Sequence, residues 1–166
     1  MALEETPGSV GTDGNLTIWF VPGEEADALS KAVLDAPTTK RITYSLTPDG
    51  FNHTVDEATI EDGRLALKQQ LQRAGTVTDT LELSYVYGAD DDVARVALTA
   101  DAKGWIVARY AVDNAAAVTA TTHKVDIIPV SCGVQRKSAP ARNAVFTIVQ
   151  KLFVTGTVLR DQAVVA

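Results

Sequence analysis

The residues that most often do chemistry are few in this chain and stand far apart. His53 and His123 could serve as general bases or metal ligands, but neither belongs to a His-x-x-x-His or His-x-x-Glu-His spacing. We therefore expect both to be ordinary surface residues, since a single histidine is a weak signal of a site. Cys132 has no histidine near it in the sequence. It is expected to be a small buried thiol on a strand rather than a nucleophile.

The run Asp90–Asp92 is the remaining candidate for ion binding. A calcium loop needs spaced acids, a glycine between them and a closing glutamate, and this run lacks that pattern. The Val-Ala-Arg-Val-Ala-Leu that follows predicts a short helix, whose N-terminus favours acidic residues. The glycines match neither a phosphate-binding loop nor a dinucleotide fingerprint. The sequence therefore predicts no catalytic residue, no metal and no cofactor, and we expect the protein not to be an enzyme.

Length and composition are those of an ordinary globular protein. A chain of 166 residues, 46% hydrophobic and 22% charged, is long enough for one domain with a sizeable core. The single cysteine excludes an internal disulfide and indicates a protein made in a reducing compartment. The N-terminus is acidic where a secretory signal would be basic, and no apolar run is long enough for a membrane span. We expect a soluble protein with no membrane partner.

Charge is distributed unevenly along the chain. The net charge is −6, which disfavours a nucleic-acid-binding protein. Residues 1–62 hold 12 acids and 3 basic residues, whereas residues 63–166 hold 9 acids and 12 basic residues. Between Ile127 and Arg160 there is no acid at all. One interpretation is a scattered solvated surface; the other is an acidic patch and a basic patch, which suits head-to-tail self-assembly.

Alternating apolar residues predict a mainly β fold, a β-sandwich or barrel with one or two short helices. Residues 1–15 are rich in Gly, Thr and acids and are expected to be a flexible N-terminal arm, with 16–166 a single β domain. A short helix is expected at 27–34. The expected strands lie at 16–21, 41–46, 105–112, 124–130, 145–153 and 156–160.

Two further elements lie between these strands. Residues 47–63 carry five acids, a proline and glycines, and are expected to form a long functional loop or an extended hairpin. Residues 65–72 and 80–87 alternate so regularly that they predict an antiparallel hairpin turning near Gly75, with Leu67 opposite Leu83 and one uniformly polar face. The polar row on that face is Lys68, Gln70, Gln72, Thr80, Glu82 and Ser84.

Several segments, taken in order, resemble major tail tube proteins of long-tailed (siphovirus-type) phages that infect actinobacteria. The resemblance runs from about Leu16 to Ala166 and depends on the order and spacing of its segments, none of which is catalytic. These segments are Thr43–Phe51 (TYSLTPDGF) followed by Asp56–Ile60, then Leu83–Tyr87, Val125–Val130 with Cys132–Gln135, and Gln150–Gly156.

The resemblance implies a structural virion protein with a tail tube β-sandwich and a flanking helix. Such subunits close into hexameric rings, and the rings stack into the tube through which phage DNA passes during ejection. The family uses no cofactor. The implied partners are further copies of the chain, together with tape-measure, tail-terminator and baseplate proteins, and DNA passes through the lumen without specific binding. The implied location is the virion tail, assembled in the host cytoplasm.

This resemblance gives the charged residues a candidate role. The acids of the 47–63 loop are expected to stack one ring on the next by meeting a basic turn near Pro140. The polar row of the predicted hairpin is expected to face the lumen. The stacking candidates are Asp49, Asp56, Glu57, Glu61 and Asp62 with Arg136, Lys137 and Arg142.

Three other functions remain open at this stage. A tail terminator or a head-decoration protein would also be a β-rich virion component. A monomeric ligand-binding β-sandwich, such as a sugar-binding module, would show aromatic residues along one strand face. Only 6% of the residues are aromatic, and Trp19 and Trp105 fall on separate predicted strands.

Overall fold

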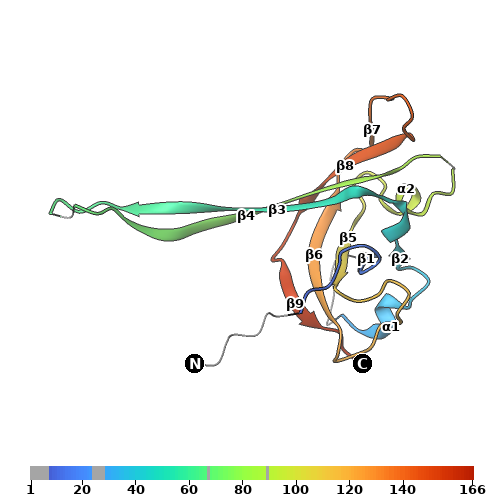
Figure 1. Ribbon diagram of the computed structural model, residues 1–166, viewed down its shortest axis with the longest axis horizontal. Helices are drawn as coiled ribbons and strands as arrows, with labels where there is room; N and C mark the ends of the chain where they lie inside the picture. The colour runs from blue at the N-terminus through green and yellow to red at the C-terminus, as the bar shows by residue number, and fades with distance from the viewer. Residues whose placement is uncertain (1–7, 24–28, 67, 89) are drawn as a thin grey trace.

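The described part of the chain folds as one antiparallel sheet from which a long two-stranded hairpin projects (Figure 1). This computed structural model describes residues 8–23, 29–66, 68–88 and 90–166. The strands follow the order β2-β1-β5-β6-β8-β4-β3, with β7 beside β8 and β9 beside β6. They are β1 (Leu16–Pro22), β2 (Lys40–Arg41), β3 (Leu46–Asp62), β4 (Leu71–Val86), β5 (Lys103–Tyr110), β6 (Lys124–Cys132), β7 (Arg136–Lys137), β8 (Thr147–Val154) and β9 (Leu159–Ala163).

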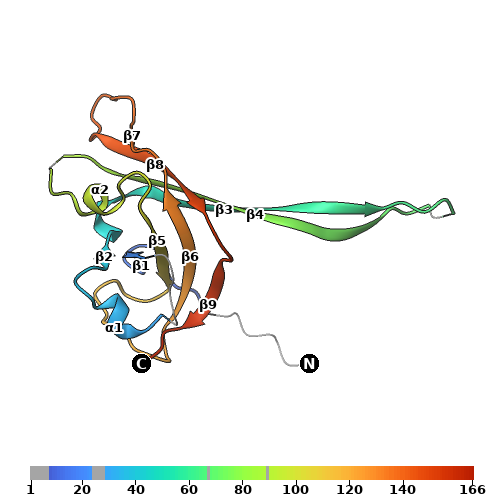
Figure 2. The same ribbon diagram turned by 180° about the vertical axis from the view of Figure 1, so that it is seen from behind.

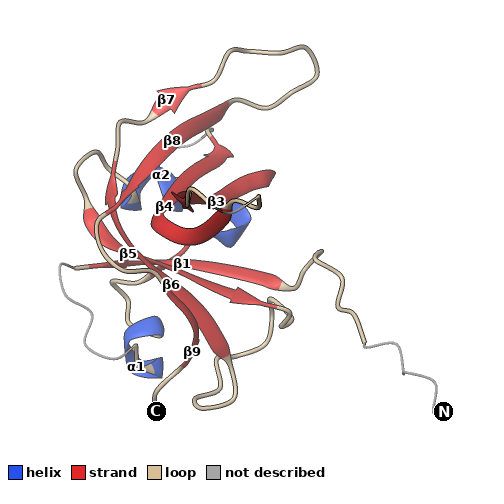
Figure 3. Cartoon of the chain, turned by 90° about the vertical axis from the view of Figure 1, so that its left-hand side faces the viewer, coloured by secondary structure: helices blue, strands red, loops and turns tan. Residues whose placement is uncertain are grey.

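The sheet curls so that its two halves enclose the main core, as the view along the hairpin shows (Figure 3). Leu81 and Leu83 on β4 belong to the same buried cluster as Ile18 and Phe20 on β1, which lies towards the other end of the strand order. Because apolar side chains from distant strands meet in one cluster, the halves act as the two layers of a sandwich. This confirms the mainly β, sandwich-like fold.

A second apolar cluster covers the outward face of one half only. Trp19, Val107 and Ile127 point away from the main core and pack against Leu34 of helix α1 (Lys31–Leu34) and against Val164. The outward face of the other half, formed by β8, β4 and β3, has no such cover among the described residues. This open face carries Glu82 of β4 and other polar side chains.

The short helices partly match the expectation. α1 occupies the second half of the predicted 27–34 helix, whose first residues lie outside the described ranges, and Ser30 caps it by accepting the Val33 amide. α2 (Val93–Ala97) follows the Asp90–Asp92 run as predicted. No helix in the described ranges is long and apolar enough to cross a bilayer.

Two predicted elements near the N-terminal third of the chain differ from the structure. The expected strand at 41–46 is wrong: Lys40–Arg41 forms a short edge strand, and Thr43–Ser45 is a 3₁₀ turn (η1). The predicted flexible N-terminal segment, residues 1–15, is described only from Gly8 onward, and there the Gly14 carbonyl accepts a hydrogen bond from the Asn114 amide at 2.7 Å. Its flexibility and the 1–15/16–166 division stay predictions.

The largest correction concerns the long loop and the hairpin. Of the two alternatives for residues 47–63, the loop is wrong and the extended hairpin is confirmed, because Leu46–Asp62 is a continuous strand paired with β4. Leu83 pairs with Phe51, and Leu67, its expected partner, lies outside the described residues; the hairpin turns between Asp62 and Leu71 rather than near Gly75. The regular spacing of leucines in 65–71 does not reflect burial, since Leu65 lies fully exposed in the turn.

Two glycines permit the irregular pairing of this long hairpin. Gly50 lies in a β-bulge between the Leu46 and Phe51 pairs, and a Cβ on it would lie 2.1 Å from the Ser84 carbonyl oxygen. Gly75 lies in a second irregularity, where a Cβ would lie 2.7 Å from the Ala58 carbonyl oxygen. Both positions therefore require the absence of a side chain.

A buried glutamine connects α2 to the main core. The Gln150 amide group donates to the carbonyl oxygens of Leu98 and Gly133, both at 2.8 Å, and its own oxygen accepts the Tyr85 hydroxyl at 2.9 Å. Burial raises the pKa of Tyr85, which keeps that hydroxyl protonated as a donor. Every polar atom of this buried amide is thus used in holding strands β4 and β8 and the end of α2 together.

We predict that Gln150→Leu destabilises the subunit by about 2–4 kcal/mol, because it removes three buried hydrogen bonds and leaves the Gly133 carbonyl without its donor, while the Leu98 carbonyl keeps only the bond from Gln135. Urea unfolding of the monomer, followed by circular dichroism, measures the change. Gln72→Leu is the control, since Gln72 is exposed on the hairpin, and a shift within about 0.5 kcal/mol is expected there. Equal stability of the two variants would contradict the structural role of Gln150.

Candidate assembly surfaces

The hairpin of β3 and β4 extends well beyond the core, and we call its outer part, residues 54–79, the arm. Figures 1 and 2 show the arm projecting from one side of the body as an isolated ribbon. Exposed apolar side chains lie along it, including Val55, Val77, Ile60 and Leu71. A two-stranded ribbon cannot bury a face by itself, so these side chains are available for contact with another molecule.

The pairing register gives the arm two chemically different faces. Side chains directly opposite each other share a face, and successive residues alternate between faces. The core-side face continues from Leu81 and includes Val55, Glu57 and Val77, because Val55 pairs with Asp79 and Glu57 with Val77. The outer face continues from Glu82.

The irregularity at Gly75 changes the face of the residues beyond it on β4. Pairing advances by two residues on β3, from Glu57 to Thr59, but by three on β4, from Val77 to Ala74. Gln72, which pairs with Glu61, therefore lies on the core-side face, although simple alternation would place it with Glu82.

This register separates the five predicted stacking acids. Glu57 and Glu61 lie on the core-side face, whereas Asp56 and Asp62 lie on the outer face. Asp49 lies apart from all of them, in the bulge at the root of the hairpin. The sequence therefore identified the right strand, but the acids form no single continuous patch.

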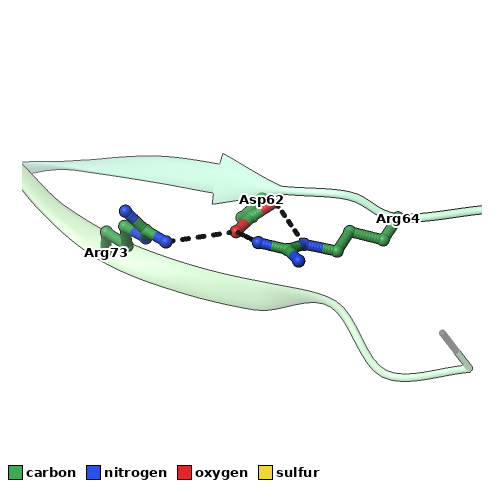
Figure 4. A network of polar contacts seen from close by, with 3 residues as sticks. All are labelled: Asp62, Arg64 and Arg73. Atoms are coloured by element: carbon green, nitrogen blue, oxygen red, sulfur yellow. Dashed lines mark hydrogen bonds and ion pairs between the residues drawn. The ribbon is translucent and has the colours of Figure 1, made fainter.

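Asp62 is already paired within its own hairpin (Figure 4). Its carboxylate accepts hydrogen bonds from Arg64 at 3.2 and 3.3 Å and lies 3.5 Å from the Arg73 guanidinium. All three groups are partly or largely exposed, so the contribution to stability is small. Its main consequence is electrostatic, because two cations offset the negative charge on the outer face near the tip.

A cluster at the arm root joins the arm to the body. One oxygen of Asp79 lies 2.8 Å from His53 Nε2 and 2.9 Å from Arg160 Nη2, so β3, β4 and β9 meet at a single carboxylate. The side chains of His53 and Asp79 are only 12% and 13% exposed. The expectation that His53 is an ordinary surface residue is therefore wrong, because its side chain is mostly covered and contacts a carboxylate 26 residues away in the sequence.

The predicted basic turn lies at another corner of the body. Arg136 and Lys137 form β7, paired with Val149 and Ile148 of β8, and Arg142 lies in the loop that connects these two strands. Lys137 Nζ lies 4.4 Å from the centre of the Tyr87 ring, a cation–π contact. Within one chain, no described ion pair links these three residues to the acids of the arm.

The structure divides the predicted lumen row. Thr80, Glu82 and Ser84 share the open outward face of β4, next to Lys151, which pairs with Glu82 across the sheet. Lys68 and Gln70 lie in the exposed turn of the hairpin, and Gln72 lies on the other face of the ribbon. Only the β4 part of the row therefore forms a continuous polar surface.

One buried cation, Arg109, was not predicted from the sequence. Its guanidinium lies 5.4 Å from the Trp19 ring and donates to Thr17 Oγ1 at 3.1 Å and to the carbonyls of Asp113 and Ala116 at 3.0 Å. Burial, with the nearby charge of Arg41, lowers the pKa of Arg109. The group anchors the 113–116 loop to β1 and is structural.

Groups for catalysis do not converge in the described ranges. No cluster of three or more His, Cys, Asp or Glu side chains there could hold a metal ion. Cys132 is buried on β6, as predicted, and burial raises its pKa to about 11, which keeps the thiol protonated and unreactive. The features that this part of the molecule presents are a projecting arm, a basic turn and an open polar face.

The sandwich body with its projecting ribbon leaves apolar and charged side chains exposed, where another molecule could contact them. The comparison with protein families agrees: the phage tail tube protein family matches residues 3–166. The chain belongs to this family, whose members are structural proteins of the phage tail. Among curated protein sequences, none matches significantly.

A similar fold occurs in the cryo-EM structure of the anti-feeding prophage (AFP) baseplate, 6-fold symmetrised. The match has a TM-score of 0.52 and covers 96% of this chain and 99% of that chain. At 14% sequence identity, the likeness concerns the fold alone.

We predict that Asp79→Asn loosens the arm root without unfolding the body, because it removes the charge that holds both His53 and Arg160. Protection of the amides of residues 54–57 against hydrogen exchange should fall about threefold to tenfold in the free subunit. Asp62→Asn removes a carboxylate at the far end of β3, the strand that carries these amides, and should leave their protection unchanged. Unchanged protection in Asp79→Asn would refute the bracing role of the cluster.

Proposed function

We propose that this protein is the tail tube subunit of a long-tailed phage that infects actinobacteria. In this function, subunits close into hexameric rings, and the rings stack into the conduit through which DNA is ejected. The observation that carries the proposal is the family match over residues 3–166. The actinobacterial host is suggested by the sequence segments described above, and the sixfold ring by the symmetry named for the AFP baseplate.

The projecting arm supports stacking of the rings. Apart from its root, where Asp79 pairs with Arg160, the ribbon keeps apolar and acidic side chains exposed, and a neighbouring subunit would supply their contacts. The candidate acids on β3 and the basic residues Arg136, Lys137 and Arg142 are accordingly proposed as the stacking contacts. Ion pairs at a solvent-exposed rim contribute only about 0.2–1 kcal/mol each, but a ring repeats every contact around its circumference.

The open face of β8, β4 and β3 is proposed to line the lumen. It presents Thr80, Glu82 and Ser84, with Lys151 beside Glu82. A strongly basic wall would bind phosphates by counterion release and retain the DNA, whereas a polar face of mixed charge would let it pass. Tape-measure protein inside the tube, and tail-terminator and baseplate proteins at its ends, are the other proposed partners.

Negative-stain electron microscopy of the purified protein tests this function directly. We predict long hollow tubes when the concentrated protein is nucleated, because arm contacts between rings repeat without end. Small closed oligomers of fixed size would instead indicate a tail terminator. Monomers at all concentrations would indicate a decoration protein or a ligand-binding module.

Labelling of an introduced cysteine tests the lumen assignment. Asn52 is exposed and lies opposite Glu82 on the open face, so Asn52→Cys should react quickly with a bulky maleimide in free subunits and at least about tenfold more slowly in tubes. Ala32→Cys on the exposed side of α1 is the control and should react at similar rates in both states. The native Cys132 gives little background, since its thiol is buried. Equal rates for Asn52→Cys in the two states would contradict the assignment.

A further inference from the structure

The two faces of the arm differ in how far their negative charge is compensated. On the outer face, Asp62 lies between Arg64 and Arg73, which leaves Asp56 as the acid there without a cation in contact. On the core-side face, Glu57 and Glu61 have no ion pair or side-chain hydrogen bond in the described structure. The core-side face therefore has the stronger uncompensated negative charge.

The same face also carries exposed apolar area next to its acids. Val55 is 48% exposed and Val77 is 55% exposed; Val77 pairs with Glu57, and Val55 lies two residues before Glu57 on the same face of β3. A contact on this face would thus combine burial of two branched side chains with neutralisation of two carboxylates. A complementary surface needs apolar side chains flanked by free cations.

The β7–β8 turn has this composition. In the turn itself, Val145 and Phe146 are 69% and 63% exposed, and Val134, just before β7, is 71% exposed. Arg136 lies in β7 and Arg142 in the turn, and neither guanidinium has an ion pair or hydrogen bond among the described residues. We call these five residues, which lie in and next to the β7–β8 turn, the basic apolar turn.

The arm and the basic apolar turn of one chain point in different directions. Figures 1 and 2 show the arm leaving one side of the body while the β7–β8 turn rises at a separate corner, away from the arm tip. Other cations of the acid-free segment 127–160 already have contacts within the chain: Arg160 pairs with Asp79, and Lys151 Nζ lies 5.6 Å from the centre of the Phe153 ring. The complementary surfaces can therefore meet only between two copies of the chain.

We infer that the core-side face of the arm, rather than its outer face, docks onto the basic apolar turn of a second copy. The inference rests on the proposed function and specifies its stacking contact: Val55 and Val77 cover the apolar side chains of the turn, and Glu57 and Glu61 pair with Arg136 and Arg142. Asp56 and Asp62 stay in solvent. The irregularity at Gly75 contributes by placing Gln72, rather than a cation, opposite Glu61 on the docking face.

The alternation of the acids along β3 supplies a matched test. The variant Glu57→Gln/Glu61→Gln and the variant Asp56→Asn/Asp62→Asn each remove two negative charges from the same strand, one from each face. The first should raise the concentration at which tubes form by about tenfold, while the second should assemble like the unchanged protein. Equal melting temperatures of the free subunits show that folding is not the cause.

Charge exchange identifies the partner surface. Glu57→Lys/Glu61→Lys should abolish tubes, and adding Arg136→Glu/Arg142→Glu should restore them, because it re-forms the pairs with opposite sign. Failure of this rescue would overturn the turn as the docking partner. Equal loss in both two-residue neutralisation variants, loss in the outer-face variant alone, or normal tubes in both would overturn the choice of face.

The two proposals fail separately in these experiments. Normal tubes from every variant would refute the docking face and leave the tail tube function standing. Absence of tubes from the unchanged protein would refute the function itself, before any variant is compared.

Discussion

Burial of Leu81, Leu83 and Tyr85 on one side of β4 is the constraint on which the other features depend. These three side chains are fully enclosed between the two halves of the sheet. A shift of β4 by one residue would expose all of them and bury Glu82 and Ser84 instead. The register of β4 is therefore fixed at its inner end, and this fixes the pairing along the arm as far as the irregularity at Gly75, although no described residue of the arm is fully buried.

The strands that line the core could be predicted from sequence because burial imposes alternation on them. β1, β5, β6 and β8 all lie near their expected positions, since one face of each must be apolar. The same reasoning failed for 46–62. Both faces of this part of the ribbon are in solvent, so nothing requires apolar and polar residues to alternate there, and the sequence resembles that of a loop. The leucines at 65, 67 and 71 caused the opposite error, because chance alternation near an exposed turn imitates a core strand.

The candidate surfaces were accessible to sequence reasoning only in part. Charge counting identified the acidic strand and the basic turn, because net charge needs no coordinates. Asp79 contacts both His53 and Arg160, and Arg109 is buried against Thr17. These contacts join distant parts of the chain, so no local sequence pattern predicts them. The change of face at Gly75 lies between these cases: an isolated glycine within a strand hints at a bulge, but only the observed pairing shows which strand carries the extra residue.

The outermost position of β3 has a consequence for the free subunit before it meets any partner. One side of this 17-residue strand pairs with β4, and the other side presents unpaired backbone amides and carbonyls to solvent. Such an edge is a template onto which any extended chain can add, which makes it a hazard at high protein concentration. Four carboxylates along 56–62 repel a second copy of the same edge. In the proposed tail tube function, this repulsion would keep newly synthesised subunits in solution, so that they add to an existing end rather than aggregate at random.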